Sequence, residues 1–286
     1  MLRTVGIVSR PRREDVAAVV PKLLEWLSAR GLECFYDRET ASCLPLADRT
    51  KPREELPAIV DLLIVLGGDG TLLATGRLVG DRSVPILPVN MGGLGFLTSV
   101  TLDELYPILE QALEGKSRIS ERIRLQAEVW RGGKMVERQF ALNEAVLNKG
   151  ALARMIDLDL RIDGDYACSY KADGFIVSTP TGSTAYSLSA GGPIIYPVVE
   201  AFVITPICPH TLTDRPLVIP NTARVEVDFH AGEGPVYLTV DGQVGIKLER
   251  GDHVTLTKAA AKLCLVRPPK TTYFEILRSK LKWGAR

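Results

Sequence analysis

The first third of the chain alternates short apolar runs with stretches of helical periodicity. Residues 4–9 and 61–66 are apolar almost throughout, which is typical of strands buried on both faces of a parallel sheet. Residues 14–30 carry apolar side chains at helical spacing and are followed by Gly31, a helix stop signal, while Pro21 predicts a kink or a later helix start.

Further strands and helices continue this alternation. Strands are expected at residues 33–36 and 85–89, with a short helix after Thr71. The segment from Thr101 to Glu104 has the form of a capping box and predicts a helix that ends near residue 115. The alternation of strands and helices predicts an open α/β domain with a mostly parallel sheet.

The pattern changes near Arg118, where short strands and tight turns replace the helices. Gly132-Gly133 and Asp163-Gly164 lie between alternating apolar segments and predict two hairpins. Further short strands are expected at residues 225–229, 236–240, 254–257 and 263–266. This half of the chain therefore predicts a β-rich, β-sandwich-like domain.

These patterns place the domain boundary between residues 117 and 118. Residues 1–117 are expected to form the α/β domain, and residues 118–271 the β-rich domain. The C-terminal segment 272–286 is expected to contain a helix, centred on residues 274–282, that packs back on the first domain.

Composition narrows the class of protein. The 286 residues include 35 basic and 34 acidic side chains, a formal charge of +1 that gives no electrostatic reason to expect nucleic acid or an anionic membrane as a partner. The sequence contains no run of about 18 apolar residues, so no membrane-spanning helix is predicted. Five scattered cysteines without a C-x-x-C pair and no recognisable signal peptide indicate a reducing interior, so we expect a cytoplasmic protein.

The segment Gly67-Gly68-Asp69-Gly70-Thr71 follows directly after a predicted buried strand. In open α/β sheets ligands bind beyond the carboxyl ends of the strands, and glycine lets the backbone approach a phosphate closely. The helix expected after this turn would direct free N–H groups at an anion. The motif lacks the Gly-Lys-Ser/Thr of a Walker loop. An ordinary strand-to-helix turn is the alternative interpretation.

Two further polar segments stand out in the second half. Asn143-Glu144 ends a predicted strand, and its carboxamide and carboxylate suit ribose hydroxyls. Taken alone, however, the pair is more typical of a strand end with solvated side chains. Residues 173–193 combine a strand with a turn rich in hydroxyls and glycine, and residues 184–190 are expected to form a helix behind it. Concentrated hydroxyls and free amides favour a nucleotide or phosphate over a surface loop.

In this order the motifs resemble the NAD kinase family. The likeness rests on the glycine turn, Asn143-Glu144, the string Thr-Pro-Thr-Gly-Ser-Thr-Ala-Tyr-Ser-Leu-Ser-Ala-Gly-Gly-Pro within residues 173–193, and residues 206–216. It implies an ATP-dependent kinase that phosphorylates the 2′-hydroxyl of the adenosine ribose of NAD to give NADP, with NAD held between two domains. It also implies a homodimer or homotetramer and Mg²⁺ or another divalent metal, for which the sequence indicates no ligands.

The resemblance also implies roles for single residues. Asp69 would be the catalytic base. The phosphate-donor loop would comprise Gly67, Gly68, Gly70 and Thr71. The NAD contacts would comprise Asp69, Gly70, Phe96, Asn143, Glu144, Arg154, Lys171, Asp173, Thr184, Ala185, Tyr186, Ser187, Leu188, Ser189 and Gln243. Many relatives have histidine where this chain has Arg154, and arginine where it has Ala74.

Two other functions share parts of this pattern. A lipid kinase of the diacylglycerol or sphingosine type would use the same glycine turn, but it would leave the string near residue 180 without a role. A non-catalytic NAD sensor would keep the fold, but the intact Asp69 argues against it. The acceptor (NAD or NADH), the donor (ATP or polyphosphate) and feedback by NADPH are alternatives that the sequence leaves open.

Overall fold

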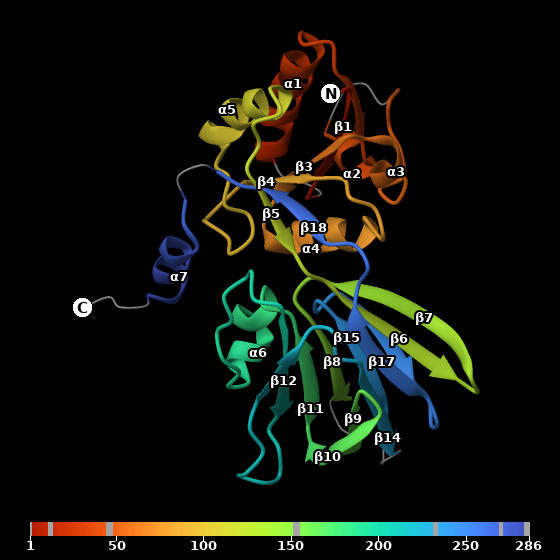
Figure 1. Ribbon diagram of the computed structural model, residues 1–286. Helices are drawn as coiled ribbons and strands as arrows, with labels where there is room; N and C mark the ends of the chain where they lie inside the picture. Colours follow the sequence, from red (N-terminus) through yellow and green to blue (C-terminus); the bar gives the residue numbers. More distant parts are fainter. Residues whose placement is uncertain are drawn as a thin grey trace. The chain divides into compact units, whose positions relative to one another are not determined.

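The computed structural model describes residues 2–10, 14–43, 48–150, 155–230, 234–268 and 271–282. The chain divides into two compact units, each with its own core (Figure 1). Unit 1 contains residues 1–121 and 263–286, and unit 2 contains residues 122–262.

Unit 1 is built on a six-stranded sheet in the order β2-β1-β3-β4-β18-β5. Its strands are β1 (Thr4–Ser9), β2 (Glu33–Tyr36), β3 (Leu62–Gly67), β4 (Ile86–Asn90), β5 (Ile119–Arg122) and β18 (Leu263–Val266). Every pairing from β2 to β18 is parallel. Parallel strands place their carboxyl ends at one edge, so the segments that follow β1, β2, β3 and β4 leave the sheet side by side.

The helices of unit 1 are α1 (Glu14–Ser28), α2 (Arg38–Ala41), α3 (Leu56–Ile59), α4 (Asp69–Leu78), α5 (Leu102–Leu113) and α7 (Tyr273–Leu281). Helices α1, α4, α5 and α7 were predicted, whereas the two single-turn helices α2 and α3 were not. Helix α1 buries an apolar stripe and runs through Pro21 from Glu14, so the later start considered for it is wrong. The capping box predicted at Thr101 and Glu104 is confirmed at the start of α5.

Unit 2 consists of two six-stranded antiparallel sheets, in the orders β10-β9-β14-β17-β6-β7 and β13-β12-β11-β8-β15-β16. The strands are β6 (Leu125–Arg131), β7 (Lys134–Ala141), β8 (Glu144–Lys149), β9 (Ile156–Ile162), β10 (Asp165–Ala172), β11 (Gly174–Ser178), β12 (Ala201–Ile207), β13 (Leu217–Pro220), β14 (Val225–His230), β15 (Val236–Val240), β16 (Val244–Leu248) and β17 (His253–Lys258). Alternate apolar residues of both sheets form a single core. An α/β unit and a β-sandwich confirm the predicted fold class.

Both predicted hairpins are present. Gly132 and Gly133 join β6 to β7 with φ of 55° and 77°, and Asp163 and Gly164 join β9 to β10 with φ of 53° and 87°. Two successive residues with positive φ are the geometry of a type I′ turn, whose twist matches that of the flanking strands.

Two expectations differ from the structure. The helix expected at residues 184–190 is instead a 3₁₀ turn, η1 (Gly182–Thr184), and a single helical turn, α6 (Tyr186–Ser189). Ala185 interrupts them with φ of −101° and ψ of −128°, outside the helical region. Residues 263–266, grouped with the β-rich half by their sequence, pair with β4 in the sheet of unit 1, so the compact units divide at residues 121/122 and 262/263.

Candidate functional site

The glycine turn of unit 1 lies at the carboxyl edge of the sheet. β3 ends at Gly67, and α4 begins two residues later at Asp69, with extended backbone at Gly68. A side chain at Gly67 would place its Cβ 2.5 Å from the Thr71 hydroxyl oxygen, so this strand-to-helix turn requires glycine. Gly70 is exposed in the first turn of α4. The predicted donor loop therefore presents backbone rather than side chains.

The carboxylate of Asp69 is surrounded by the loop that follows β4. Its Oδ2 accepts a hydrogen bond from the Phe96 amide at 2.9 Å. Its Oδ1 accepts from the Leu97 amide at 3.2 Å, the Thr98 amide at 2.9 Å and the Thr98 hydroxyl at 2.9 Å. A Cβ at Gly95 would lie 2.2 Å from both Asp69 Oδ1 and Thr98 Oγ1. The loop therefore closes on the carboxylate only because residue 95 is glycine.

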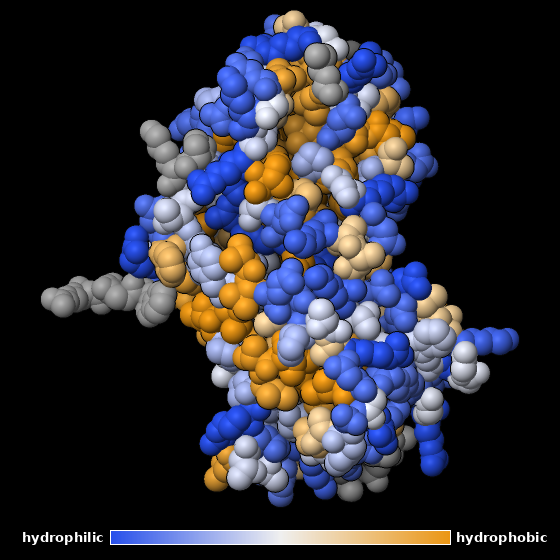
Figure 2. All heavy atoms as spheres, in the orientation of Figure 1, coloured by the Kyte–Doolittle hydropathy of each residue, from blue (hydrophilic) through white to orange (hydrophobic). Residues whose placement is uncertain are grey.

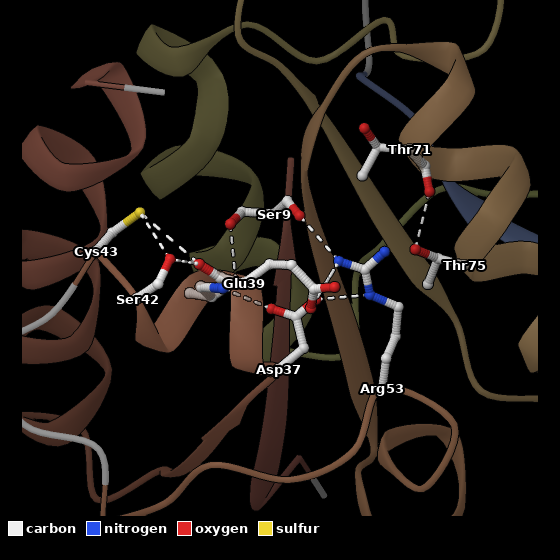
Figure 3. A network of polar contacts seen from close by, with 9 residues as sticks. Ser9, Asp37, Glu39, Ser42, Cys43, Arg53, Thr71 and Thr75 are labelled. Atoms are coloured by element: carbon white, nitrogen blue, oxygen red, sulfur yellow. Dashed lines mark hydrogen bonds and ion pairs between the residues drawn. The ribbon is translucent and has the colours of Figure 1, made fainter. Parts of the chain in front are cut away.

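A second polar network occupies the same edge, next to β1 and β2. Asp37, which follows β2, is fully buried and accepts from the Thr40 amide at 2.8 Å and from Arg53 Nε at 2.6 Å. The Arg53 guanidinium also donates to the Ser9 carbonyl at 3.1 Å (Figure 3). Sequence reasoning missed this network because the sequence around Asp37 and Arg53 matches no motif. We assign it the structural role of fixing the ends of these two strands.

In unit 2 the Asn143-Glu144 bend is held by Asp241, in the turn between β15 and β16. The Asp241 carboxylate accepts from the backbone amides of Leu142, Asn143 and Glu144 at 3.0, 2.8 and 3.2 Å. Gly242, with φ of 64°, completes the turn that presents this carboxylate. The predicted residue Gln243 is exposed in the same turn, two residues after the Asp241 that holds Asn143 and Glu144.

The string near residue 180 meets the same bend. The Asn143 carbonyl accepts from the Thr179 amide at 2.9 Å. A Cβ at Gly182 would lie 2.2 Å from that carbonyl oxygen and 2.4 Å from its carbon. Gly182 therefore permits direct backbone packing between the two motifs, which lie far apart in the sequence.

Glu144 differs from its neighbours because its side chain is buried without adequate polar partners. It is 5% exposed, and its Oε2 has no hydrogen-bond partner among the described residues. Burial, and secondarily the charge of Asp241, raises the pKa of Glu144 to about 8, although the Tyr186 amide lowers it in part. At neutral pH Glu144 is therefore mostly a neutral acid that can donate a hydrogen bond.

The predicted hydroxyls of the string have different environments. Ser183 and Ser187 are buried, and the Ser187 hydroxyl lies 3.0 Å from that of Thr205. Tyr186 and Ser189 are exposed, whereas Thr184, Ala185 and Leu188 are partly exposed. The hydroxyl of Ser187 thus supports the fold, while Thr184, Tyr186 and Ser189 remain accessible to a ligand.

The other predicted site residues are spread along unit 2 and the Asp69 loop. Lys171 is exposed on β10, and Asp173 forms an ion pair with Lys149 Nζ at 2.8 Å. Phe96 is partly exposed and contributes its amide to the Asp69 carboxylate. Arg154 lies outside the described residues.

Within the described ranges, no group of three or more acidic, cysteine or histidine side chains is arranged to hold a metal ion. No helix there has both the length and the apolar character needed to cross a membrane.

Comparison with known proteins agrees with the motifs. Residues 5–117 match the family model of the ATP-NAD kinase N-terminal domain, and residues 142–268 match that of the ATP-NAD kinase C-terminal domain. The chain is 50% identical to the NAD kinase of Solibacter usitatus over 286 residues, which cover 100% of this chain and 99% of the relative. It is 47% identical to that of Geotalea daltonii over 100% of both chains.

Two solved structures are also similar. The yeast NADH kinase complexed with NADH shares 28% identity at a TM-score of 0.90, over 100% of this chain and 89% of the yeast chain. An NAD kinase from Archaeoglobus fulgidus in complex with ATP shares 26% identity at a TM-score of 0.77, over 98% of both chains.

Proposed function

This chain belongs to the ATP-NAD kinase family, and we propose that it transfers the γ-phosphoryl group of ATP to the 2′-hydroxyl of the adenosine ribose of NAD. The ribose oxygen forms a bond to the γ-phosphorus as the bond from that phosphorus to the ADP oxygen breaks. Family membership over nearly the whole chain excludes the lipid-kinase alternative.

Asp69 is the proposed acceptor of the ribose hydroxyl proton. The observation that supports this role is its position at the tip of β3, where the loop after β4 holds its carboxylate by four hydrogen bonds. A base held in one orientation loses little freedom when the substrate binds. The neighbouring amides of the glycine turn are the proposed contacts for the donor phosphates.

Unit 2 is proposed to supply most of the dinucleotide contacts. Ribose hydroxyls both donate and accept, and this unit offers the Asn143 carboxamide, the neutral Glu144 and the accessible Thr184 and Ser189 as complementary groups. Lys171 and Asp173 are proposed to interact with the rest of the dinucleotide. Arg154 is proposed to contact NAD, as the resemblance to the family implies.

Magnesium is proposed to enter as part of the donor, bound to the ATP phosphates. The described residues offer no three-ligand cluster for a resident ion, and Mg²⁺ is commonly held by substrate phosphates with few protein ligands. When bound there, the ion would neutralise phosphate charge.

We further propose a homodimer or homotetramer in the cytoplasm. Unit 2 exposes large apolar side chains around α6, β12 and β13, where Figure 2 also shows hydrophobic residues gathered: Tyr186, Tyr196, Val198, Val199, Leu212, Leu217 and Val218. A contiguous exposed apolar surface is typical of a subunit interface. No disulfide joins any of the five cysteines, all of which lie in the described residues, and this suits a reducing compartment.

Substitution of Asp69 tests the central assignment. We expect Asp69→Asn to lower kcat for NADP formation by at least about 100-fold, because loss of a general base typically costs that much. The matched control is Asp61→Asn at the amino end of β3, whose carboxylate accepts two backbone amides and a hydroxyl, one amide fewer than that of Asp69. A folded Asp69→Asn enzyme with near-normal kcat would refute the base, and absence of NADP formation by the wild type would favour a sensor.

A further inference from the structure

We propose that Asn90 and Thr98 are positioning residues for the phosphoryl transfer. Together they fix the Asp69 carboxylate in one orientation, with Oδ1 committed to the protein and Oδ2 left to accept the ribose hydroxyl. This inference rests on the role proposed above for Asp69. Neither Asn90 nor Thr98 was singled out by sequence reasoning.

Asn90 ends β4 and organises the loop that follows. Its Nδ2 shares its two hydrogens among the Gly93 carbonyl at 2.8 Å, the Thr98 carbonyl at 3.1 Å and the Thr98 hydroxyl at 3.0 Å. Its Oδ1 accepts from the Gly92 amide at 2.7 Å. Because the nitrogen lies against two carbonyl oxygens and the oxygen against an N–H group, only one orientation of the carboxamide satisfies every partner.

The direction of the Thr98 hydroxyl follows from the Asn90 carboxamide. An amide nitrogen can only donate, so the Thr98 oxygen accepts from Asn90 and its single hydrogen is free for another acceptor. That acceptor is Asp69 Oδ1, 2.9 Å away. Thr98 is fully buried and Asn90 is 8% exposed, so water competes little for these bonds. The result is a chain of two hydrogen bonds with a fixed direction, in which Asn90 donates to Thr98 and Thr98 donates to Asp69.

This chain makes the two oxygens of Asp69 unequal. Oδ1 receives two amides and the Thr98 hydroxyl, whereas Oδ2 receives only the Phe96 amide. A carboxylate has about four lone-pair sites over its two oxygens, so the remaining capacity is on Oδ2. Loss of the Thr98 hydroxyl would remove one of the three hydrogen bonds that hold Oδ1 and loosen the orientation of the carboxylate. Small misplacements of a reacting group cost up to about 100-fold in rate.

The test compares variants of Thr98 that differ by a single group. Thr98→Ser keeps the hydroxyl and Thr98→Ala removes it, while both lose the methyl, so their ratio isolates the hydrogen bond. We expect kcat of the Ser variant to exceed that of the Ala variant by about 10-fold or more, with KM for NAD and ATP within about threefold. Thr98→Val should resemble Thr98→Ala.

Thr75→Val is the matched control for loss of a buried hydroxyl in unit 1. Thr75 is 2% exposed and donates to the Thr71 carbonyl at 2.9 Å within α4. We expect this variant to keep the wild-type kcat. Circular dichroism of every variant confirms folding before kinetics are compared.

A double-variant cycle tests Asn90. Asn90→Asp replaces the donor with an acceptor that competes for the Thr98 hydrogen, so kcat should fall. Because the proposed effect of both residues on Asp69 passes through the Thr98 hydroxyl, Asn90→Asp combined with Thr98→Val should lose no more kcat than the worse single variant. If the losses of kcat in the two single variants multiply in the double variant, the proposed series of hydrogen bonds from Asn90 through Thr98 to Asp69 is overturned.

Equal kcat for the Ser and Ala variants, alongside a large loss in Asp69→Asn, would overturn the positioning role and leave the base intact. A near-normal Asp69→Asn would instead overturn the base itself.

Discussion

The carboxylates of Asp69 and Glu144, one in each unit, have opposite environments. Asp69 is partly exposed and receives four hydrogen bonds from one loop. Glu144 is buried at the start of a central strand, with Oε2 unpartnered among the described residues and a pKa raised to about 8. The contrast shows that burial beside a second carboxylate makes Glu144 a neutral donor, whereas the loop after β4 surrounds Asp69 with hydrogen-bond donors alone.

The two units also differ in what their glycines accommodate. Gly95 makes room for the side chains of Asp69 and Thr98, which can move, whereas Gly182 makes room for the backbone of Asn143, which cannot. Alanine at position 182 is therefore expected to cost more stability than alanine at position 95.

The largest structural effect is expected for Gly182→Ala. Its Cβ would lie within 2.5 Å of three backbone atoms of Asn143, so the two motifs of unit 2 would separate. We expect a loss of about 3 kcal/mol in the free energy of unfolding, measured by urea denaturation, since overpacking costs about 1–3 kcal/mol or more. A stability equal to wild type would show that this packing is not required.

Gly95→Ala should destabilise less but impair turnover more. The added methyl would displace the Asp69 carboxylate, so we expect kcat to fall by about 10-fold to 100-fold, with a loss of stability nearer about 1 kcal/mol. Gly93→Ala is the steric control, because its Cβ would meet nothing within 4 Å and its melting temperature should match wild type. Unchanged kcat in Gly95→Ala would contradict the tight closure of this loop on Asp69.

The effect expected for Glu144→Gln depends on pH and is the smallest of the three only in acid. The raised pKa of Glu144 means that the folded protein holds this proton between about pH 4.5 and pH 8 while the unfolded chain releases it. Glu144 therefore costs stability progressively as pH rises through this window, and the cost is absent below it. The melting temperature of Glu144→Gln relative to wild type should rise between pH 5 and pH 8.5. A flat difference would place the pKa of Glu144 near its ordinary value.

Local patterns predicted most of the architecture. The apolar runs, the helical stripe of α1, the capping box at Thr101 and the Gly-Gly and Asp-Gly turns depend on residues close in sequence, and all were found. The glycine turn after β3 and the string near residue 180 were recognisable because close approach of backbone demands glycine at fixed spacing.

Contacts between distant segments were beyond these patterns. The pairing of β18 with β4, the attachment of Asp241 to the Asn143-Glu144 bend and the chain from Asn90 through Thr98 to Asp69 join residues that share no local periodicity. Local preferences set which strands and turns form, but the orientation of a carboxylate and the charge it carries depend on which donors and apolar groups the folded chain brings around it. For that reason the motifs identified the family, and only the tertiary structure distinguished the two oxygens of Asp69 and the neutral state of Glu144.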